Sequence, residues 1–115
     1  LETLVKDSEI IFITTGDNAI SSVAKELSSL NVSDKTFVHM SGAMTTDELI
    51  LLKNQGAHTC SMHPLQTFSD TEKAVKDLKN AYFALEGDYD KLESLVKQLG
   101  NPYFTLSKDQ KNKYH

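Results

Sequence analysis

Four consecutive apolar residues, Ile10 to Ile13, place a short hydrophobic run near the start of this sequence. An apolar run without polar alternation is typical of a strand covered on both faces, as the strands of parallel sheets are. Four further stretches are rich in apolar, β-branched or aromatic residues. The sequence therefore predicts strands at residues 9–14, 35–40, 57–62, 81–85 and 103–106.

Helical patterns separate these strands. Residues 17–30 repeat Ala19, Val23 and Leu27 on one face, which is the spacing of an amphipathic helix. Further helix starts are predicted where a capping residue is followed three positions later by Glu or Gln. These pairs are Thr45 with Glu48, Ser69 with Glu72, Asp90 with Glu93, and Ser107 with Gln110. We expect Gly56 and Gly100 to end the second and fourth of the helices that lie between strands.

Strands that alternate with helices indicate right-handed βαβ crossovers. We expect an α/β fold with a mostly parallel sheet of about five strands and flanking helices. Residues 1–106 would form this domain, and residues 107–115 would begin another helix. Leu1, Leu4 and Val5 resemble the last turn of a helix, so we expect the chain to be an internal piece of a longer protein.

Composition narrows the possible partners. Sixteen acidic and twelve basic residues among 115 give a net charge of −4, which disfavours nucleic-acid binding because phosphates require a basic patch. The sequence contains neither an apolar run of membrane-spanning length nor a secretory signal pattern. One cysteine, Cys60, rules out an internal disulfide and suits a reducing cytoplasm.

Ligands of open α/β sheets bind beyond the carboxyl ends of the strands. At three of these ends the sequence carries small, hydrogen-bonding or titratable residues, whereas the opposite connections are ordinary polar turns. The residues are Thr15, Gly16, Asp17 and Asn18 after the first strand, Ser41 and Gly42 after the second, and His63, Pro64, Gln66 and Thr67 after the third. We expect them to share one site.

Structural interpretations of the same residues stay open. Asp17 and Asn18 suit a turn or a helix N-cap, and Ser41 with Gly42 suits a simple turn. Because proline holds the preceding residue extended, we expect His63 to end its strand and to point out of the sheet, where it would be the proton donor. The alternative is a buried His63 bonded to a backbone carbonyl.

We expect structural roles for two nearby residues, His39 and Cys60. His39 ends the neighbouring strand, and we expect it to pack in the core rather than to act as a partner of His63. Cys60 and His63 have the spacing of half a metal site, but structural zinc sites take four Cys or His ligands. We therefore expect no metal, and Cys60 as a small core residue.

The sequence resembles, most specifically in its run HPLQTF at residues 63–68, a family of bacterial proteins that join a Rossmann-like, NADP-oxidoreductase-type domain to a C-terminal all-helical domain. Residues 38–43, 83–88 and 109–115 carry the same resemblance. More distantly, the arrangement is similar to prephenate dehydrogenases, pyrroline-5-carboxylate reductases and deazaflavin-dependent NADP oxidoreductases.

This resemblance implies the second half of a nucleotide-binding domain. The loop from Thr15 to Asn18 would border the ribose and pyrophosphate of NADP or NAD, and the Ser41–Gly42 loop would lie near the nicotinamide. The segment from His63 to Thr67 would face a small-molecule substrate. Residues 111–115 would begin the helical domain that closes the cleft.

One departure matters, because no Gly-x-Gly occurs in the sequence and the phosphate loop of the first βαβ unit is therefore missing. We expect the chain alone to be inactive and to bind dinucleotide weakly. Three functions stay open: part of an NAD(P)-dependent oxidoreductase, a non-catalytic nucleotide- or metabolite-sensing module, or an autonomous protein-interaction scaffold. We also expect the first strand to lie at a sheet edge and to pair with a second copy in a homodimer, or with further residues.

Overall fold

The computed structural model describes residues 2–65 and 82–114. The strands are β1 (Ile10–Ile13), β2 (Thr36–His39), β3 (His58–Leu65), β4 (Tyr82–Gly87) and β5 (Tyr103–Leu106). The helices are α1 (Glu2–Asp7), α2 (Ile20–Leu27), α3 (Ile50–Asn54), α5 (Asp90–Leu99) and α6 (Lys108–Tyr114), with the 3-10 turns η1 (Asp17–Ala19) and η2 (Thr46–Leu49). The helix expected at residues 69–78 lies outside the described part of the chain.

The five strands form one sheet in the order β1-β2-β3-β4-β5. β1 pairs with β2, β2 with β3 and β4 with β5 in parallel, whereas β4 runs antiparallel to β3. The predicted α/β fold with a mostly parallel sheet is therefore confirmed. The one antiparallel pair among the described strands is β3 with β4.

β3 is longer than the sequence predicted. Its pairing with β2 stops where His39 meets Ser61, whereas β4 pairs with it as far as Leu65. Beyond Ser61 the strand therefore has a ladder partner on one side only, and such a position tolerates Pro64, which has no N–H to donate. The prediction that His63 ends its strand is wrong for this reason: His63 lies within β3.

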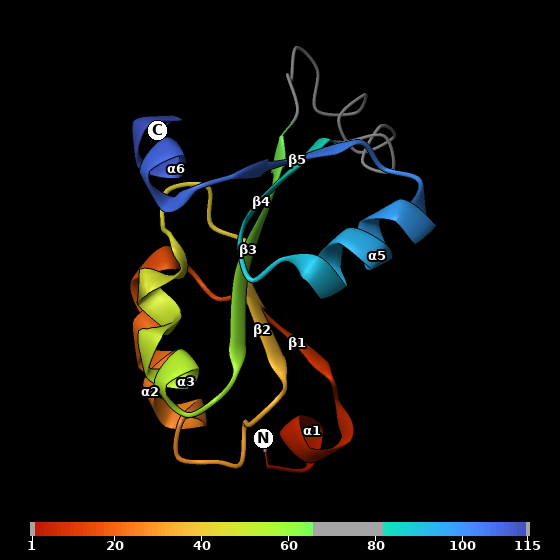
Figure 1. Ribbon diagram of the computed structural model, residues 1–115. Coiled ribbons are helices and arrows are strands. Elements are labelled where there is room, and N and C mark those ends of the chain that lie inside the picture. Colours follow the sequence, from red (N-terminus) through yellow and green to blue (C-terminus); the bar gives the residue numbers. More distant parts are fainter. Residues whose placement is uncertain (1, 66–81, 115) are drawn as a thin grey trace.

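Helices cover both faces of the sheet, with α2 and α3 on one side and α5 on the other (Figure 1). The core under α2 and α3 consists of Val5, Ile11, Ile13, Ile20, Ala24, Leu27, Val32, Phe37, Leu49, Leu52 and Ala57. The core under α5 consists of Val38, Cys60, Met62, Leu85, Leu92 and Val96. Successive side chains of a strand point to opposite faces, so one strand supplies both cores.

The helix signals had mixed outcomes. At α6 the capping box is complete, because the Gln110 N–H donates to Ser107 Oγ at 3.1 Å and the Ser107 N–H donates to Gln110 Oε1 at 2.8 Å. Thr45 caps η2 but accepts from the Asp47 N–H, at 3.3 Å, instead of from Glu48. The N-terminal caps therefore follow the predicted pattern at one helix fully and at another in part.

The start of α5 differs from the prediction. Tyr89 precedes this helix without a side-chain cap bond and Asp90 already lies in its first turn, so the expected Asp90 cap is wrong. Glu93 instead accepts a bond from the Tyr103 hydroxyl at 2.8 Å. Gly56 and Gly100 have φ of 92° and 80°, the left-handed conformation that was predicted to end their helices.

The two ends of the described chain carry short helices. In α1, Val5 is buried in the core under α2 and α3. This agrees with the helical turn that was predicted at the start of the chain. β1 is an end strand of the sheet among the described residues, and its Phe12 is 39% exposed, which confirms the expected edge. Within residues 2–65 and 82–114, no helix has the length and apolar character to cross a membrane.

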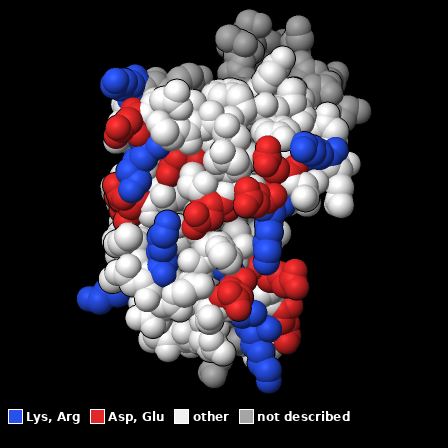
Figure 2. Space-filling view, in the orientation of Figure 1, with Lys and Arg blue, Asp and Glu red and all other residues white. Residues whose placement is uncertain are grey.

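Charged side chains of both signs are interspersed on the face that Figure 2 shows. Two ion pairs join different elements: Lys108 Nζ lies 2.6 Å from Asp47 Oδ1, and Lys53 Nζ lies 3.8 Å from Asp88 Oδ2. All four side chains are well exposed, so each pair contributes at most about 1 kcal/mol. These two ion pairs therefore stabilise the fold only weakly.

Candidate functional site

The register of the three parallel strands brings their carboxyl ends together. Ile13 of β1 lies opposite His39 of β2, and His39 lies opposite Ser61 of β3. The chain leaves β1 and β2 at this level, while β3 continues past it. We call the region formed by residues 14–18, residues 40–44 and His63 the rim. Its loops come from neighbouring strands, as the candidate site requires.

The loop after β2 is held by short polar bonds. Ser41 Oγ accepts from the N–H groups of Ala43, at 3.1 Å, and of Met44, at 3.0 Å. The Ser41 N–H in turn donates to His39 Nδ1 at 3.1 Å. Ser41 is buried, so this side chain shapes the loop from inside and is not open to a ligand; Gly42 is the member of the pair at which the next contact occurs.

His39 fixes that loop as a neutral ring. Its Nε2 lies 2.9 Å from the Thr45 carbonyl, which can only accept, so Nε2 carries the proton and Nδ1 accepts from the Ser41 N–H. Burial lowers the pKa of His39 below its ordinary value of 6.5, and Lys111 lowers it further, against the raising effects of the Thr45 bond, Glu86 and Asp17. The expectation of a core-packed His39 is confirmed, since the ring is fully buried.

His63 lies against the same loop. Its Nδ1 is 3.3 Å from the Met40 carbonyl, so Nδ1 carries a proton in this contact. A Cβ added to Gly42 would lie only 2.5 Å from His63 Nε2. The absence of a side chain at Gly42 therefore lets the imidazole lie directly on the loop backbone, with Nε2 as the ring atom nearest to Gly42.

The structural interpretation of His63 holds in part, because the ring is half-buried and bonds a backbone carbonyl. The ring also lies beside Gly42. Its role toward a ligand stays a prediction. Pro64 follows it within β3 and is also half-buried. Gln66 and Thr67 lie outside the described residues.

The loop after β1 is exposed from Thr14 to Asn18. Gly16 precedes η1 in an extended conformation and makes no side-chain cap bond, and Asp17 is the first residue of η1. The helix expected from residue 17 thus begins as a 3-10 turn and becomes α2 only at Ile20. Nothing lies within 4 Å of a Cβ placed on Gly16, so a ligand has room to approach this backbone.

Sequence reasoning missed a polar cluster directly beside the rim, in which Lys111 contacts Ser61 and Ser61 contacts Glu86. Lys111 is 3% exposed and Glu86 2% exposed. Burial lowers the pKa of Lys111 from its ordinary value of 10.5, and Glu86 opposes that effect. No local pattern distinguishes Lys111 from the exposed lysines near it, because its partners are 50 and 70 residues away.

Cys60 is buried within β3, and burial raises the pKa of its thiol to about 12. A thiol in that state is not a nucleophile near neutral pH, and the expected core role is confirmed. Among the residues that the structure describes, no group of three or more His, Cys, Asp or Glu side chains could hold a metal ion.

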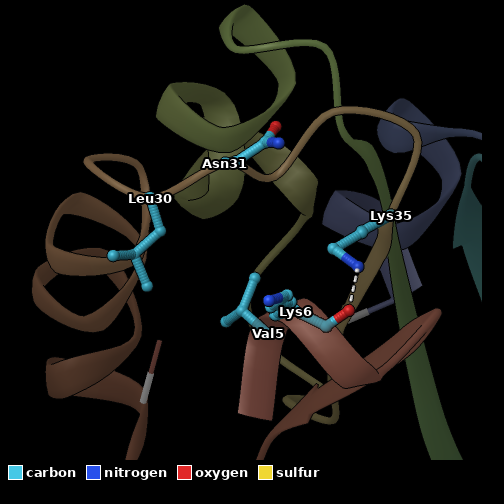
Figure 3. Close-up of a pocket in the computed structure, with 5 residues that line it drawn as sticks. All are labelled: Val5, Lys6, Leu30, Asn31 and Lys35. Atoms are coloured by element: carbon cyan, nitrogen blue, oxygen red, sulfur yellow. Dashed lines mark hydrogen bonds between the residues drawn. The ribbon is translucent and has the colours of Figure 1, made fainter. Parts of the chain in front are cut away.

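A separate pocket lies at the opposite end of the strands, lined by Val5, Lys6, Leu30, Asn31 and Lys35 (Figure 3). Lys35 Nζ donates to the carbonyls of Lys6 at 3.3 Å and Ser8 at 2.9 Å. Its ammonium is therefore engaged with the end of α1, where a cation is favoured. The bonds from Lys35 to the end of α1 therefore give this pocket lysine a structural role.

Solved structures share the fold of this chain. A Thermotoga maritima protein is 31% identical, with a TM-score of 0.69, and the match covers 98% of this chain and 43% of that one. A pyrroline-5-carboxylate reductase from Coxiella burnetii (12% identity, TM-score 0.72) matches over 98% of this chain and 42% of its own. A reductive aminase from Aspergillus terreus, solved with NADPH and ethyl-5-oxohexanoate, matches at 16% identity and TM-score 0.65 over 98% and 40% of the two chains.

These matches confirm the predicted similarity to Rossmann-like oxidoreductases at the level of the fold. The chain spans less than half the length of each of these structures. No protein-family model matches the sequence, and no curated protein matches it.

Proposed function

We propose that this chain supplies the nicotinamide-side and substrate-side loops of an NAD(P)-dependent oxidoreductase. The observation that supports this most is the contact at the rim, where the His63 imidazole lies on Gly42 at the carboxyl ends of parallel strands. Structural neighbours of the same fold include an enzyme solved with NADPH. Parallel strand ends of this kind are where such folds bind dinucleotides.

The residues of the rim fit a dinucleotide in chemistry. Asp17 and Asn18 are exposed and offer an acceptor and a donor to sugar hydroxyls, and Gly16 leaves its backbone open to close approach. Ser41 would act by fixing the loop, with Gly42 beside the nicotinamide. Thr15 would complete the cofactor contacts. The cofactor choice between NADP and NAD follows from residues of the first βαβ unit, which this sequence lacks.

In this proposal the bound cofactor supplies a hydride, and His63 supplies a proton. Nδ1 donates to the Met40 carbonyl. An imidazole suits the role of a general acid because each of its two ring nitrogens can carry a proton. Pro64, Gln66 and Thr67 would contact the small-molecule substrate. Residues 1–106 would then be the nucleotide-binding domain, and residues 107–115 would start the helical domain.

NADPH oxidation by the full-length protein tests this function. A panel of imine, enol and keto-acid substrates should contain at least one that supports turnover, and His63→Ala should lower kcat about 10²–10⁴-fold, the range for losing a general acid. His58→Ala is the matched control, because His58 is exposed at the far end of the same strand and should leave turnover unchanged. Turnover that survives in His63→Ala would contradict the assignment.

A non-catalytic sensing module of the same fold is the second candidate, favoured by the carbonyl bond that already engages His63 Nδ1. It predicts that NADPH raises the melting temperature of the full-length protein while no substrate on the panel is turned over. Pairing of the exposed edge of β1 with a second copy, giving a homodimer, is compatible with either candidate. Sedimentation equilibrium of wild type and of a β1 variant, Phe12→Lys, would show whether this edge is an interface.

A further inference from the structure

Lys111 joins α6 to two segments that are remote in the sequence. Its Nζ donates to the Ser41 carbonyl at 2.8 Å and to Ser61 Oγ at 2.7 Å. A lysine side chain is rarely buried unless its charge is compensated, and Lys111 is buried. Both acceptors are uncharged oxygens. The buried positive charge of Lys111 therefore requires a negative group in the same cluster.

Glu86 is that group. Ser61 Oγ donates to Glu86 Oε1 at 3.0 Å, the Thr46 N–H donates to the same oxygen at 3.1 Å, and the Thr46 hydroxyl donates to Oε2 at 2.8 Å. Every partner is a donor, so the geometry matches an ionised carboxylate. One hydroxyl, that of Ser61, links the ammonium of Lys111 to this carboxylate.

The Ser41 contact acts directly on the rim. The Ser41 carbonyl accepts from Lys111 and its N–H donates to His39, while its hydroxyl accepts from the N–H groups of Ala43 and Met44. These bonds fix the backbone just before Gly42. Because the His63 ring lies on Gly42 with no side chain between them, a displacement of this loop displaces the surface on which the imidazole lies.

We propose that Lys111 is a positioning residue for the rim: by bonding the Ser41 carbonyl, with its charge balanced through Ser61 by Glu86, it sets the place of Gly42 and thereby of the His63 imidazole. The helix that follows β5 is thus coupled to the loop that follows β2. The proposal rests on the function proposed above for what the positioned groups do, but the coupling itself is a property of the chain alone.

α6 has other contacts that a change at Lys111 does not remove. The helix retains its capping box at Ser107 and Gln110 and the Lys108–Asp47 ion pair. A variant at Lys111 should therefore loosen the rim loop without releasing the whole helix. Lys113 provides a matched control, because it lies on the same helix and is exposed.

Amide hydrogen exchange of the full-length protein, followed by NMR, measures this coupling without any substrate. In Lys111→Met, exchange at Ala43 and Met44 should rise about tenfold or more, the effect of losing one hydrogen bond to a charged group. Exchange at Phe37 should stay as in wild type, and Lys113→Met should behave as wild type throughout. Exchange at Ala43 and Met44 within twofold of wild type in Lys111→Met would overturn the proposal.

A second readout separates positioning from a general loss of stability. The ring proton resonances of His63 should move in Lys111→Met and stay in place in Lys113→Met, because only the former displaces Gly42. If Lys111→Met does not fold, Ser61→Ala, which removes the link to Glu86 but keeps the lysine, should show the same two changes at smaller size. Unchanged His63 resonances in a folded variant would overturn the proposal.

The two proposals fail in different ways. Loss of exchange protection at Ala43 in Lys111→Met, together with no NADPH binding by the wild-type protein, would support the coupling and contradict the oxidoreductase function. NADPH binding by the wild type, with unchanged exchange in Lys111→Met, would contradict the coupling and leave the oxidoreductase function supported.

Discussion

One face of β2 is apolar at its amino end and polar at its carboxyl end. Phe37 packs under α2 and α3 among hydrocarbon side chains, and two residues further along the strand His39 lies in a cluster of hydrogen bonds. Ser61 of β3, which pairs with His39, bonds Glu86 and Lys111. From this difference we infer that the apolar end stabilises the fold, whereas the polar end fixes the position of the loop after β2.

The largest expected effect belongs to the apolar end. Phe37→Ala should lower the free energy of unfolding by about 3–5 kcal/mol, the usual cost of removing a buried aromatic ring from a core. Urea denaturation followed by circular dichroism measures this change. A loss of less than about 1 kcal/mol would contradict the assignment of stability to the apolar end, because it would mean that this end contributes little to the free energy of unfolding.

That apolar end was also the part that the sequence predicted well. The apolar run at Ile10 and the spacing of Val23 and Leu27 are local patterns, and local patterns determine strands and helices. The left-handed stops at Gly56 and Gly100 are local in the same way.

The polar end was predicted only in outline. Gly42 and His63 were expected to share a site, and they lie side by side because strand order carries them to one edge. Lys111 and Glu86 were missed because only their bonding partners distinguish them from exposed charged residues. The partners of Lys111 lie 50 and 70 residues away in the sequence, and those of Glu86 lie 25 and 40 residues away. The continuation of β3 through Pro64 was missed because it depends on where β2 stops pairing.

An intermediate effect is expected at Gly42. A Cβ there would lie 2.5–2.8 Å from three atoms of the His63 ring, so Gly42→Ala should displace the ring and cost about 1–3 kcal/mol, as overpacking does. NMR of the His63 ring protons with urea denaturation measures both consequences. Gly16→Ala is the control for the ring, since nothing lies within 4 Å of its Cβ. A His63 ring that stays in place in Gly42→Ala would contradict the contact.

The smallest effect is a pH dependence due to His39. Burial, with a further contribution from Lys111, lowers the pKa of this ring below 6.5 in the folded protein, although Thr45, Glu86 and Asp17 oppose the shift. Below pH 6.5 the unfolded chain therefore binds a proton that the folded chain does not, so stability falls as pH falls, by at most about 1.4 kcal/mol per pH unit.

Urea denaturation between pH 7 and pH 5 measures this slope. His39→Gln should reduce the slope, because it removes the titrating ring, whereas His58→Gln should leave the slope nearly unchanged, because His58 is exposed. An unchanged slope in His39→Gln would show that the polar end contributes nothing to the acid sensitivity of the fold.

The most direct test of the rim as the ligand site is a titration of the full-length protein with NADPH, followed through backbone amide resonances. We expect the amide resonances of Gly16 and Gly42 to shift together as the cofactor binds, while those of Lys6 and Lys35, which line the pocket at the other end of the strands, do not move. Shifts confined to Lys6 and Lys35, or no shift at Gly42 at saturating NADPH, would contradict it.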